Sequence, residues 1–497
     1  MSLLVRSWPI LGAALSGILM LLCFPPFEQD WFAWLALSPL LAAIWFRTNS
    51  QLGRLALGYL SGVLFFGATF YWIGKASILG WLALTLYLPV YPAIWAWFAG
   101  LPACRLRFDG SPLDPGDRLA PWRRSVTSVT VAMVLAAGWV ILEWTRGWLF
   151  SGFGWNGLGV ALHGNIPFIQ LAGIGGVPLL SFLVVFGNVI AVTTVSRLIA
   201  EAGRLTWASR SDFTVALAIV LVAFGQGVRM SLETVDTRKM KVALVQAAAG
   251  DDAKSFDEYL QLSVLASVQK PDLIVWPEGA PGKPLLDNIA TFGAAAKAAV
   301  PESGNIWLLT GSDEHAPDGS YNSAFAIAPG GSGLQTYRKR HLIPFYETGS
   351  EGYTPGKSSK PLWIMNANAN LGALICIEDT IPELARTNAR DRANVLVNLT
   401  NDGIFDDRVA ERQHFLNAIF RAPETGLPLI RCANTGVTAI VDRQGRVTQQ
   451  LEAGSPGILT GEIHFPVSGA RTFHTQWGDW FVAACAGIVV LRLIVPR

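Results

Sequence analysis

The distribution of apolar residues constrains the fold of this chain more than any other feature. Long apolar runs fill residues 1–229 and another lies near 480–495, whereas residues 240–465 alternate short apolar runs with polar stretches. Each long run covers about 17–25 residues, enough for a helix to cross a hydrocarbon core roughly 30 Å thick. The mean hydropathy of +0.38 is higher, and the 15% of charged residues lower, than soluble proteins show. The sequence therefore predicts a multi-pass α-helical membrane protein that carries one α/β domain.

The apolar runs predict eight transmembrane helices. They are expected near residues 8–25, 30–46, 55–73, 78–100, 128–150, 169–196, 213–228 and 479–495. Several helices follow the first one and no small-residue cleavage pattern stands out, so we interpret it as a retained helix and not as a signal peptide. This gives a seven-helix transmembrane domain over 1–229, an α/β domain over 230–470 and an eighth helix within 471–497.

The positions of the arginines predict the orientation in the membrane. Every second connection or terminus is basic, with Arg6, Arg47, Arg54, Arg105, Arg107, Arg118, Arg123, Arg124, Arg197, Arg204, Arg210, Arg492 and Arg497. The other connections, "PPFEQD", "GKAS" and "SGFGWNGLGVALHGN", share a single lysine. Because basic loops stay in the cytoplasm, we expect cytoplasmic termini and an α/β domain outside the cytoplasm. The net charge of +2 hides this asymmetry, and no basic stripe interleaved with aromatics suggests nucleic-acid binding.

The outer domain has the pattern of an α/β fold with buried sheets. Eight short apolar runs are typical of buried strands: "VALVQA", "LIVWPE", "IWLLTG", "SAFAIA", "LGALICIE", "VLVNLT", "LPLIRCAN" and "VTAIVD". Helical patterns lie between some of them, at 287–300 and 408–424. Helices that alternate with buried strands indicate an α/β architecture. Hinges are expected at 234–239 and 469–476.

Three reactive side chains stand at strand ends or in loops of this domain. Glu278 follows the strand-like "LIVWP", Lys339 lies in "TYRKRHLIPFYE", and Cys376 ends the run "LGALI". A carboxylate can take the proton of a thiol, and an ammonium group favours thiolate and then a developing oxyanion. Taken singly, each residue has an ordinary explanation. Glu278 could cap a turn, Lys339 could be one of three solvated cations, and Cys376 could be a buried structural cysteine.

The other cysteines and the histidines give weaker signals. Cys376 and Cys432 are the two cysteines of the outer domain, and in an oxidising compartment they could form a disulfide. Each lies in its own strand-like segment, which favours free thiols. Neither a Cys-x-x-Cys pair nor clustered histidines occur, so no metal site is expected.

Taken together and in this order, the three segments resemble the nitrilase, or carbon–nitrogen hydrolase, superfamily. "WPEGA", "YRKRHLIPFYE" and "ICIED" match its three motifs. The membrane helices, "EWTRGWLFSGFGW" at 143–155, "NLTNDGIFDD" and "RQHFLNAIFRAPETGLPLIRCANTGVTA" are similar to the apolipoprotein N-acyltransferases of bacterial inner membranes. The resemblance implies an αββα sandwich with Glu278 as general base, Lys339 as oxyanion stabiliser and Cys376 as nucleophile, without a cofactor.

The resemblance also implies the reaction and the partners. Cys376 would take an acyl chain from a phospholipid as a thioester and release a lysophospholipid. The α-amine of the diacylglyceryl-modified N-terminal cysteine of an apolipoprotein would then accept the chain as an amide. The enzyme would lie in the inner membrane with its catalytic domain in the periplasm.

Several positions match or depart from the family pattern. Glu347 and Glu378 match acidic residues near the family's active site. Three positions depart from the pattern where the family handles substrate or positions its lid: Ile377 replaces the usual tyrosine, Ile404 the aromatic of "NDxWF", and Phe256 a tryptophan. These departures leave open a membrane-bound amidase of the nitrilase type, or an acyltransferase that acts on another amine.

A third alternative is a catalytically silent scaffold or transporter. Charges within membrane helices are expected along transport paths, but Glu143 and Arg146 stand three residues apart at an outer helix end and are expected to form a local pair. The long connections 346–360 and 401–411 are rich in glycine, serine and charge, and are expected to be mobile lids over the active site.

Overall fold

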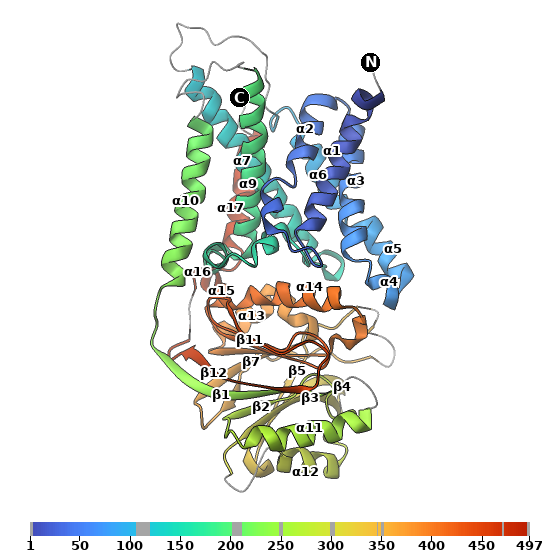
Figure 1. Ribbon diagram of the computed structural model, residues 1–497, viewed down its shortest axis with the longest axis vertical. Helices are drawn as coiled ribbons and strands as arrows, with labels where there is room; N and C mark the ends of the chain where they lie inside the picture. Colours follow the sequence, from blue (N-terminus) through green and yellow to red (C-terminus); the bar gives the residue numbers. More distant parts are fainter. Residues whose placement is uncertain are drawn as a thin grey trace. The chain divides into compact units, whose positions relative to one another are not determined.

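The chain folds into two compact units, Met1–Ser231 with Asp479–Arg497, and Leu232–Gly478 (Figure 1). A computed structural model describes residues 3–105, 120–200, 211–247, 252–298, 304–344, 346–348, 352–469 and 472–494. Several basic residues used to predict the orientation, Arg107, Arg118, Arg204, Arg210 and Arg497, lie outside the described residues, as do residues 349–351 of the expected lid.

The first unit is helical. Its main elements are α1 (Leu3–Leu22), η1 (Asp30–Trp34), α2 (Ser38–Arg47), α3 (Gln51–Thr69), α4 (Ile73–Ala76), α5 (Ile78–Tyr87), α6 (Val90–Ala99), α7 (Ala120–Arg146), η2 (Leu149–Ser151), η3 (Leu158–Leu162), α8 (Ile166–Ile169), α9 (Ala172–Ala200), α10 (Ser211–Ser231) and α17 (Trp480–Ile494). Among the described residues, five stretches are long and apolar enough to cross a membrane: α3, α5 with α6, α7, α9 and α10. The apolar parts of α1 and α17 are shorter.

The structure differs from the expectation at residues 30–46, which do not form one helix. They form η1 and the ten-residue α2, whose rise of about 15 Å is half of a hydrocarbon core. Asn188 of α9, fully buried, bonds to the backbone at this break. Its Oδ1 accepts from the N–H of Leu37 at 2.8 Å, and its Nδ2 donates to the carbonyl of Ala33 at 2.8 Å. Non-helical backbone at membrane depth needs such partners, and the count of eight spanning helices stays a prediction.

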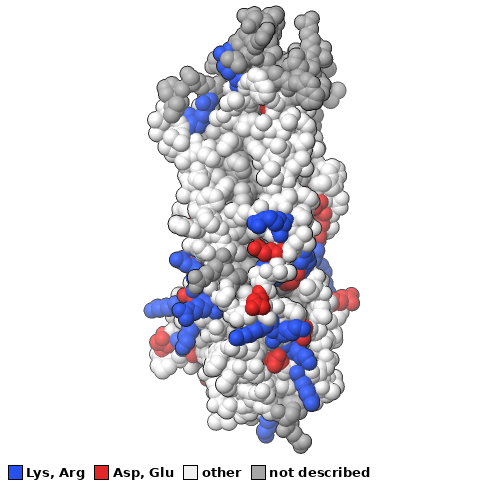
Figure 2. Space-filling model, turned by 90° about the vertical axis from the view of Figure 1, so that its left-hand side faces the viewer, with Lys and Arg blue, Asp and Glu red and all other residues white. Residues whose placement is uncertain are grey.

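The surface and the ends of the helical unit agree with a membrane location. On the face shown in Figure 2, a band of the upper half shows almost no charged side chains, between the basic ones near the top and the charged lower half. The first residues of α1 and the last of α17 lie at one end of this unit, and α10 ends at the opposite end (Figure 1).

Glu143 and Arg146 make no close ion pair with each other within the described residues, although their charges attract, and each has other partners. Glu143 Oε1 accepts the N–H of Leu158 at 2.7 Å. The guanidinium of Arg146 donates to the carbonyl of Gly154 and lies 5.2 Å from the ring centroid of Phe66.

The second unit contains two six-stranded sheets with strand orders β12-β1-β2-β3-β4-β5 and β11-β10-β9-β8-β7-β6. The strands are β1 (Thr237–Gln246), β2 (Leu273–Val275), β3 (Trp307–Ala316), β4 (Gly319–Ile327), β5 (Leu334–Arg338), β6 (Leu362–Ile364), β7 (Ala369–Ile375), β8 (Val395–Thr400), β9 (Leu429–Ala433), β10 (Ala439–Val441), β11 (Val447–Gln450) and β12 (Gly457–Pro466). The helices are α11 (Asp252–Ser267), α12 (Ile289–Ala298), α13 (Pro382–Arg390), α14 (Arg408–Ile419), α15 (Arg421–Thr425) and α16 (Phe473–Trp477).

Alternating side chains of the central strands explain the layers. In β1, Val242 and Leu244 join the core between the two sheets, whereas Ala243 and Val245 face α11 and α12. The second sheet does the same, with Ile375 of β7 inside and Leu374 packed on α13 and α14. Buried on both faces, these strands have the continuous apolar runs seen in the sequence. The expected αββα sandwich is confirmed.

Candidate active site

Glu278 lies just beyond the carboxyl end of strand β2. Strand β2 ends at Val275, Pro277 cannot continue the ladder, and Glu278 follows. Its Oε1 accepts from the amide nitrogen of Asn322 on β4 at 2.7 Å, and its Oε2 accepts the N–H of Asn401, just after β8, at 2.8 Å. One carboxylate is therefore held by a residue from each sheet, in a fixed orientation.

Lys339 follows β5 and is 1% exposed, so the explanation of a solvated cation fails for it. Its Nζ lies 2.8 Å from Glu347 Oε1 and 3.7 Å from Glu278 Oε1. Asn322 also donates to Glu347 Oε1, at 3.1 Å, and so bridges the two carboxylates. One ammonium group therefore contacts both glutamate side chains.

Cys376 is the first residue after β7, in the 3₁₀ turn η6 (Cys376–Thr380), and is 1% exposed. Its φ of +54° lies in the left-handed region that non-glycine residues seldom adopt. The surroundings impose this conformation, as is usual for strained residues at functional sites.

Glu378 ties the turn of Cys376 to the segment that carries Lys339. Its Oε2 accepts the N–H of Ile375 at 2.8 Å and the hydroxyl of Tyr337 at 2.7 Å. Its Oε1 accepts the N–H of Arg340 at 2.6 Å. The predicted Glu278, Lys339, Cys376, Glu347 and Glu378 are thus brought into one cluster, in which Glu378 serves as a structural clamp.

The pKa values in this cluster follow from burial and neighbouring charge. Burial, and after it the charge of Glu278, raise the pKa of the Cys376 thiol well above its usual range, and Lys339 opposes this. Burial also raises the pKa of Glu278 against the opposing charge of Lys339. Burial lowers the pKa of Lys339, but Cys376, Glu278 and Glu347 outweigh it and raise that pKa overall. At neutral pH the resting site therefore holds a protonated thiol beside an ammonium group.

The three positions that depart from the family pattern lie in different surroundings. Phe256 on α11 packs edge-on against Trp276 at 6.1 Å between ring centroids, in the core between α11 and the first sheet. Ile377, next to Cys376, is half-buried against the core between the sheets. Ile404 lies half-buried in the turn η7 (Asp402–Phe405) that follows Asn401.

Each of the two segments expected to be lids, 346–360 and 401–411, is fixed in part by contacts beside the site. The N–H of Gly356 donates to the carbonyl of Lys339 at 2.7 Å, which fixes the described second half of 346–360. In 401–411, Asp402 is fully buried and α14 already begins at Arg408. Mobility in this second segment is therefore expected only around Gly403–Asp406.

Asn322 and Asn401 were missed by the sequence reasoning. Asn322 and Ser323 are polar residues in an otherwise apolar strand run, "YNSAFAI", and that irregularity could have drawn attention to Asn322 but not to its partners. The backbone N–H of Asn401 has no signature in the side-chain pattern.

All five cysteines are free thiols. Cys432 is fully buried in β9, and its Sγ donates to the carbonyl of Val275 at 3.3 Å. It therefore has the contacts of a structural core residue.

Comparisons with known proteins identify the family. Residues 16–190 match the model of the apolipoprotein N-acyltransferase N-terminal domain, and residues 241–471 match that of carbon-nitrogen hydrolase. The apolipoprotein N-acyltransferase of Geobacter metallireducens is 30% identical, over 98% of this chain and 95% of its own. That of Bradyrhizobium diazoefficiens is 32% identical, over 86% of this chain and 80% of its own. The chain therefore belongs to the apolipoprotein N-acyltransferase family.

Proposed function

We propose that this protein transfers an acyl chain from a phospholipid to the α-amine of the diacylglyceryl-modified N-terminal cysteine of an apolipoprotein. Family membership supports the reaction class. The observation that carries the assignment of roles is the buried Lys339 ammonium, 2.8 Å from Glu347 and 3.7 Å from Glu278, beside the strained turn of Cys376.

In the first half-reaction, the Cys376 Sγ attacks the ester carbonyl of the phospholipid while its proton passes to Glu278. The tetrahedral oxyanion is stabilised by the positive charge of Lys339. Its collapse breaks the C–O bond, Glu278 returns the proton to the leaving alkoxide, and a lysophospholipid departs. The acyl chain remains on Cys376 as a thioester.

In the second half-reaction, the α-amine of the apolipoprotein attacks the thioester carbonyl and loses a proton to Glu278. A second oxyanion forms beside Lys339 and collapses with cleavage of the C–S bond. Glu278 then reprotonates the Cys376 sulfur, and the product is an amide. The thiol is protonated at rest because its pKa is raised by burial, so the nucleophile is generated only when base and substrate are both in place.

The proposed location is the bacterial inner membrane, with cytoplasmic termini and a periplasmic catalytic unit. The arginine pattern supports this orientation. The positions of the ends of α1, α17 and α10 within the helical unit agree with it (Figure 1).

The experiment uses the full-length protein in detergent with phospholipid and two versions of one diacylglyceryl peptide. One version has a free α-amine and the other is N-acetylated. Acylation of the free-amine peptide alone, with release of lysophospholipid, is expected. Release of free fatty acid with an unmodified peptide would indicate an amidase-like hydrolase, and acylation of a different amine in preference to the peptide would indicate another acceptor.

A further inference from the structure

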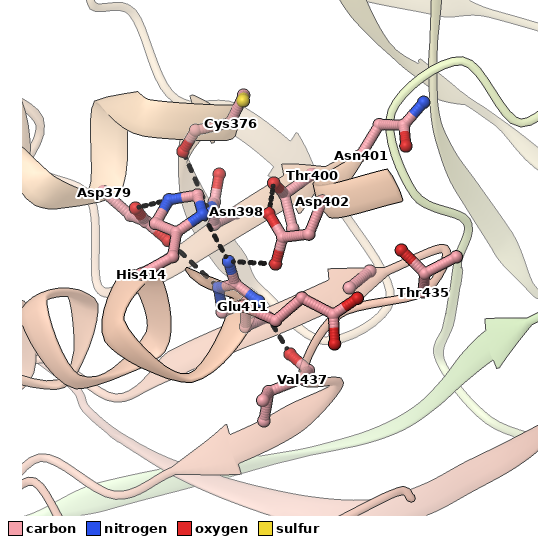
Figure 3. A network of polar contacts seen from close by, with 12 residues as sticks. Cys376, Asp379, Asn398, Thr400, Asn401, Asp402, Glu411, His414, Thr435 and Val437 are labelled. Atoms are coloured by element: carbon pink, nitrogen blue, oxygen red, sulfur yellow. Dashed lines mark hydrogen bonds and ion pairs between the residues drawn. The ribbon is translucent and has the colours of Figure 1, made fainter. Parts of the chain in front are cut away.

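Four charged side chains are completely buried near the Cys376 turn, and Figure 3 labels three of them, Asp379, Asp402 and His414. This charge cluster consists of Asp379, Asp402, His414 and Arg431. His414 Nε2 lies 2.8 Å from Asp379 Oδ1, and His414 Nδ1 lies 2.8 Å from Asp402 Oδ1. Arg431 Nε reaches Asp379 Oδ2 at 3.1 Å, and its Nη2 reaches Asp402 Oδ2 at 2.9 Å. Each carboxylate is thus bound by both cations.

The charge cluster joins the supports of two reactive groups. Asp379 lies in η6, three residues after Cys376, and Asp402 directly follows Asn401, whose N–H binds Glu278. His414 comes from α14 and Arg431 from β9, so the two carboxylates are connected through elements far apart in sequence.

Two uncharged side chains extend the cluster to the backbone around it. Asn398 donates to the carbonyl of Cys376 at 3.2 Å and also contacts Asp379 (Figure 3). The hydroxyl of Thr400 donates to Asp402 Oδ1 at 2.9 Å. The strained backbone of Cys376 is therefore held directly by this network.

His414 keeps its charge at neutral pH. Burial opposes protonation, but Asp379 and Asp402 raise the pKa of His414 to about 9 despite the repulsion of Arg431. An imidazolium donates from both ring nitrogens, as the two contacts require.

Buried charges are costly even when paired, and apolar residues of similar volume often stabilise a core equally well. Such a cluster beside a strained nucleophile calls for a further role. We propose that the charge cluster consists of positioning residues. Asp379, Asp402, His414 and Arg431 would hold the Cys376 turn at a fixed position relative to the Asn401 N–H, which binds Glu278, so that the thiol can pass its proton to Glu278. The inference rests on the proposed function of this site.

The proposal concerns the rate of thiol chemistry and not the binding of lipid. None of the four side chains is assigned a contact with the reacting atoms. A change in the position of the Cys376 turn relative to Glu278 should therefore lower kcat for acylation and slow alkylation of Cys376, while KM for phospholipid stays the same. A displacement of about 1 Å can cost up to roughly 100-fold in rate.

The test uses His414→Gln and Asp379→Asn in the full-length protein. Two rates are measured: alkylation of Cys376 by iodoacetamide, read by mass, and acyl-enzyme formation from phospholipid. Both rates are expected to fall by about 10- to 100-fold with KM unchanged. A folded variant with wild-type rates, or one with a raised KM and an unchanged kcat, overturns the proposal.

Asn394→Ala is the matched control. Asn394 is buried at the amino end of β8, where its Oδ1 accepts the N–H of Asn370 at 2.8 Å, and Cys376 lies beyond the opposite end of the neighbouring β7. This variant should lose stability and keep both rates. If it slows them as much as His414→Gln does, general destabilisation explains the effect and the proposal fails.

Thr400→Val keeps the test decisive if the charged variants do not fold. It removes one hydroxyl donor to Asp402 and leaves all four charges, so a smaller loss of both rates is expected. If His414→Gln, Asp379→Asn and Thr400→Val all fail to fold while the control folds, the cluster serves folding alone and the positioning role is refuted. Alkylation needs neither lipid nor acceptor, so this result stays separate from a failure of the acyl-transfer assay.

Discussion

Replacing Lys339 by methionine tests the electrostatics of the site. Methionine keeps most of the length of the lysine side chain and removes its charge. In the wild type, Nζ lies 2.8 Å from Glu347 and 3.7 Å from Glu278. With an effective dielectric constant of about 20, the gross attractions are about 6 and about 4.5 kcal/mol. Desolvation of the buried ammonium offsets part of this, so the net effect is smaller.

Two consequences are expected for Lys339→Met. Removing one partner of a buried pair costs about 3–5 kcal/mol, or roughly 6–20 °C in melting temperature at about 2–4 °C per kcal/mol for a domain of this size. Losing the charge beside each oxyanion should slow both half-reactions by about 10²–10³.

The stability loss should shrink at low pH. Burial already raises the pKa of Glu278, and Lys339 opposes that shift. Without the ammonium, Glu278 binds a proton more readily in the folded than in the unfolded chain. Protonation therefore favours the folded state as the pH falls, and the gap in melting temperature between Lys339→Met and the wild type narrows.

Single-turnover acylation and thermal unfolding measure both effects. Arg338→Met is the matched control, because Arg338 is a neighbouring cation that pairs with Glu314 at 2.6 Å, outside the cluster around Cys376. It should retain nearly wild-type acylation. A folded Lys339→Met variant that acylates as fast as Arg338→Met would refute the assigned role of Lys339.

Three further predictions concern the base, the second cysteine and the topology. Glu278→Gln should lower the acylation rate by about 10²–10⁴. In the wild type the acylation rate should fall as the pH drops through the pKa of Glu278, which burial raises above its usual 4.5. The same pH profile in both proteins would argue against Glu278 as base. Cys432→Ser should change acylation little and lower the melting temperature, because it puts a hydroxyl in a buried core position; strong loss of acylation in a stable variant would contradict the structural role. A reporter joined after Arg238 should behave as exported, and cytoplasmic reporter activity would reject the orientation.

The sequence predicted the layers of the outer unit well because its strands are buried on both faces. All eight apolar runs named from the sequence fall on strands. The exposed β11 has no apolar pattern and was missed. In the helical unit, the apolar run 30–46 hides a break at Leu35–Leu37, since the hydrogen bonds that permit it include those of Asn188, about 150 residues away.

In the site, too, the sequence predicts local features but not contacts between distant segments. Glu278, Lys339 and Cys376 lie at strand ends in recognisable motifs, so the sequence was enough to name them. Asn322 and His414 act through partners 44 and 35 residues away. Such contacts exist only once the two sheets and α14 are packed, and a single sequence does not reveal them.

The most direct test of the central claim is the intact mass of the protein after incubation with phospholipid in the absence of acceptor. The account predicts one added acyl chain in the wild type and in Cys432→Ser, mapped to Cys376, sensitive to hydroxylamine and removed by a free-amine lipopeptide. Cys376→Ala should gain no mass. An acylated Cys376→Ala protein that still passes its chain to the lipopeptide would contradict the account.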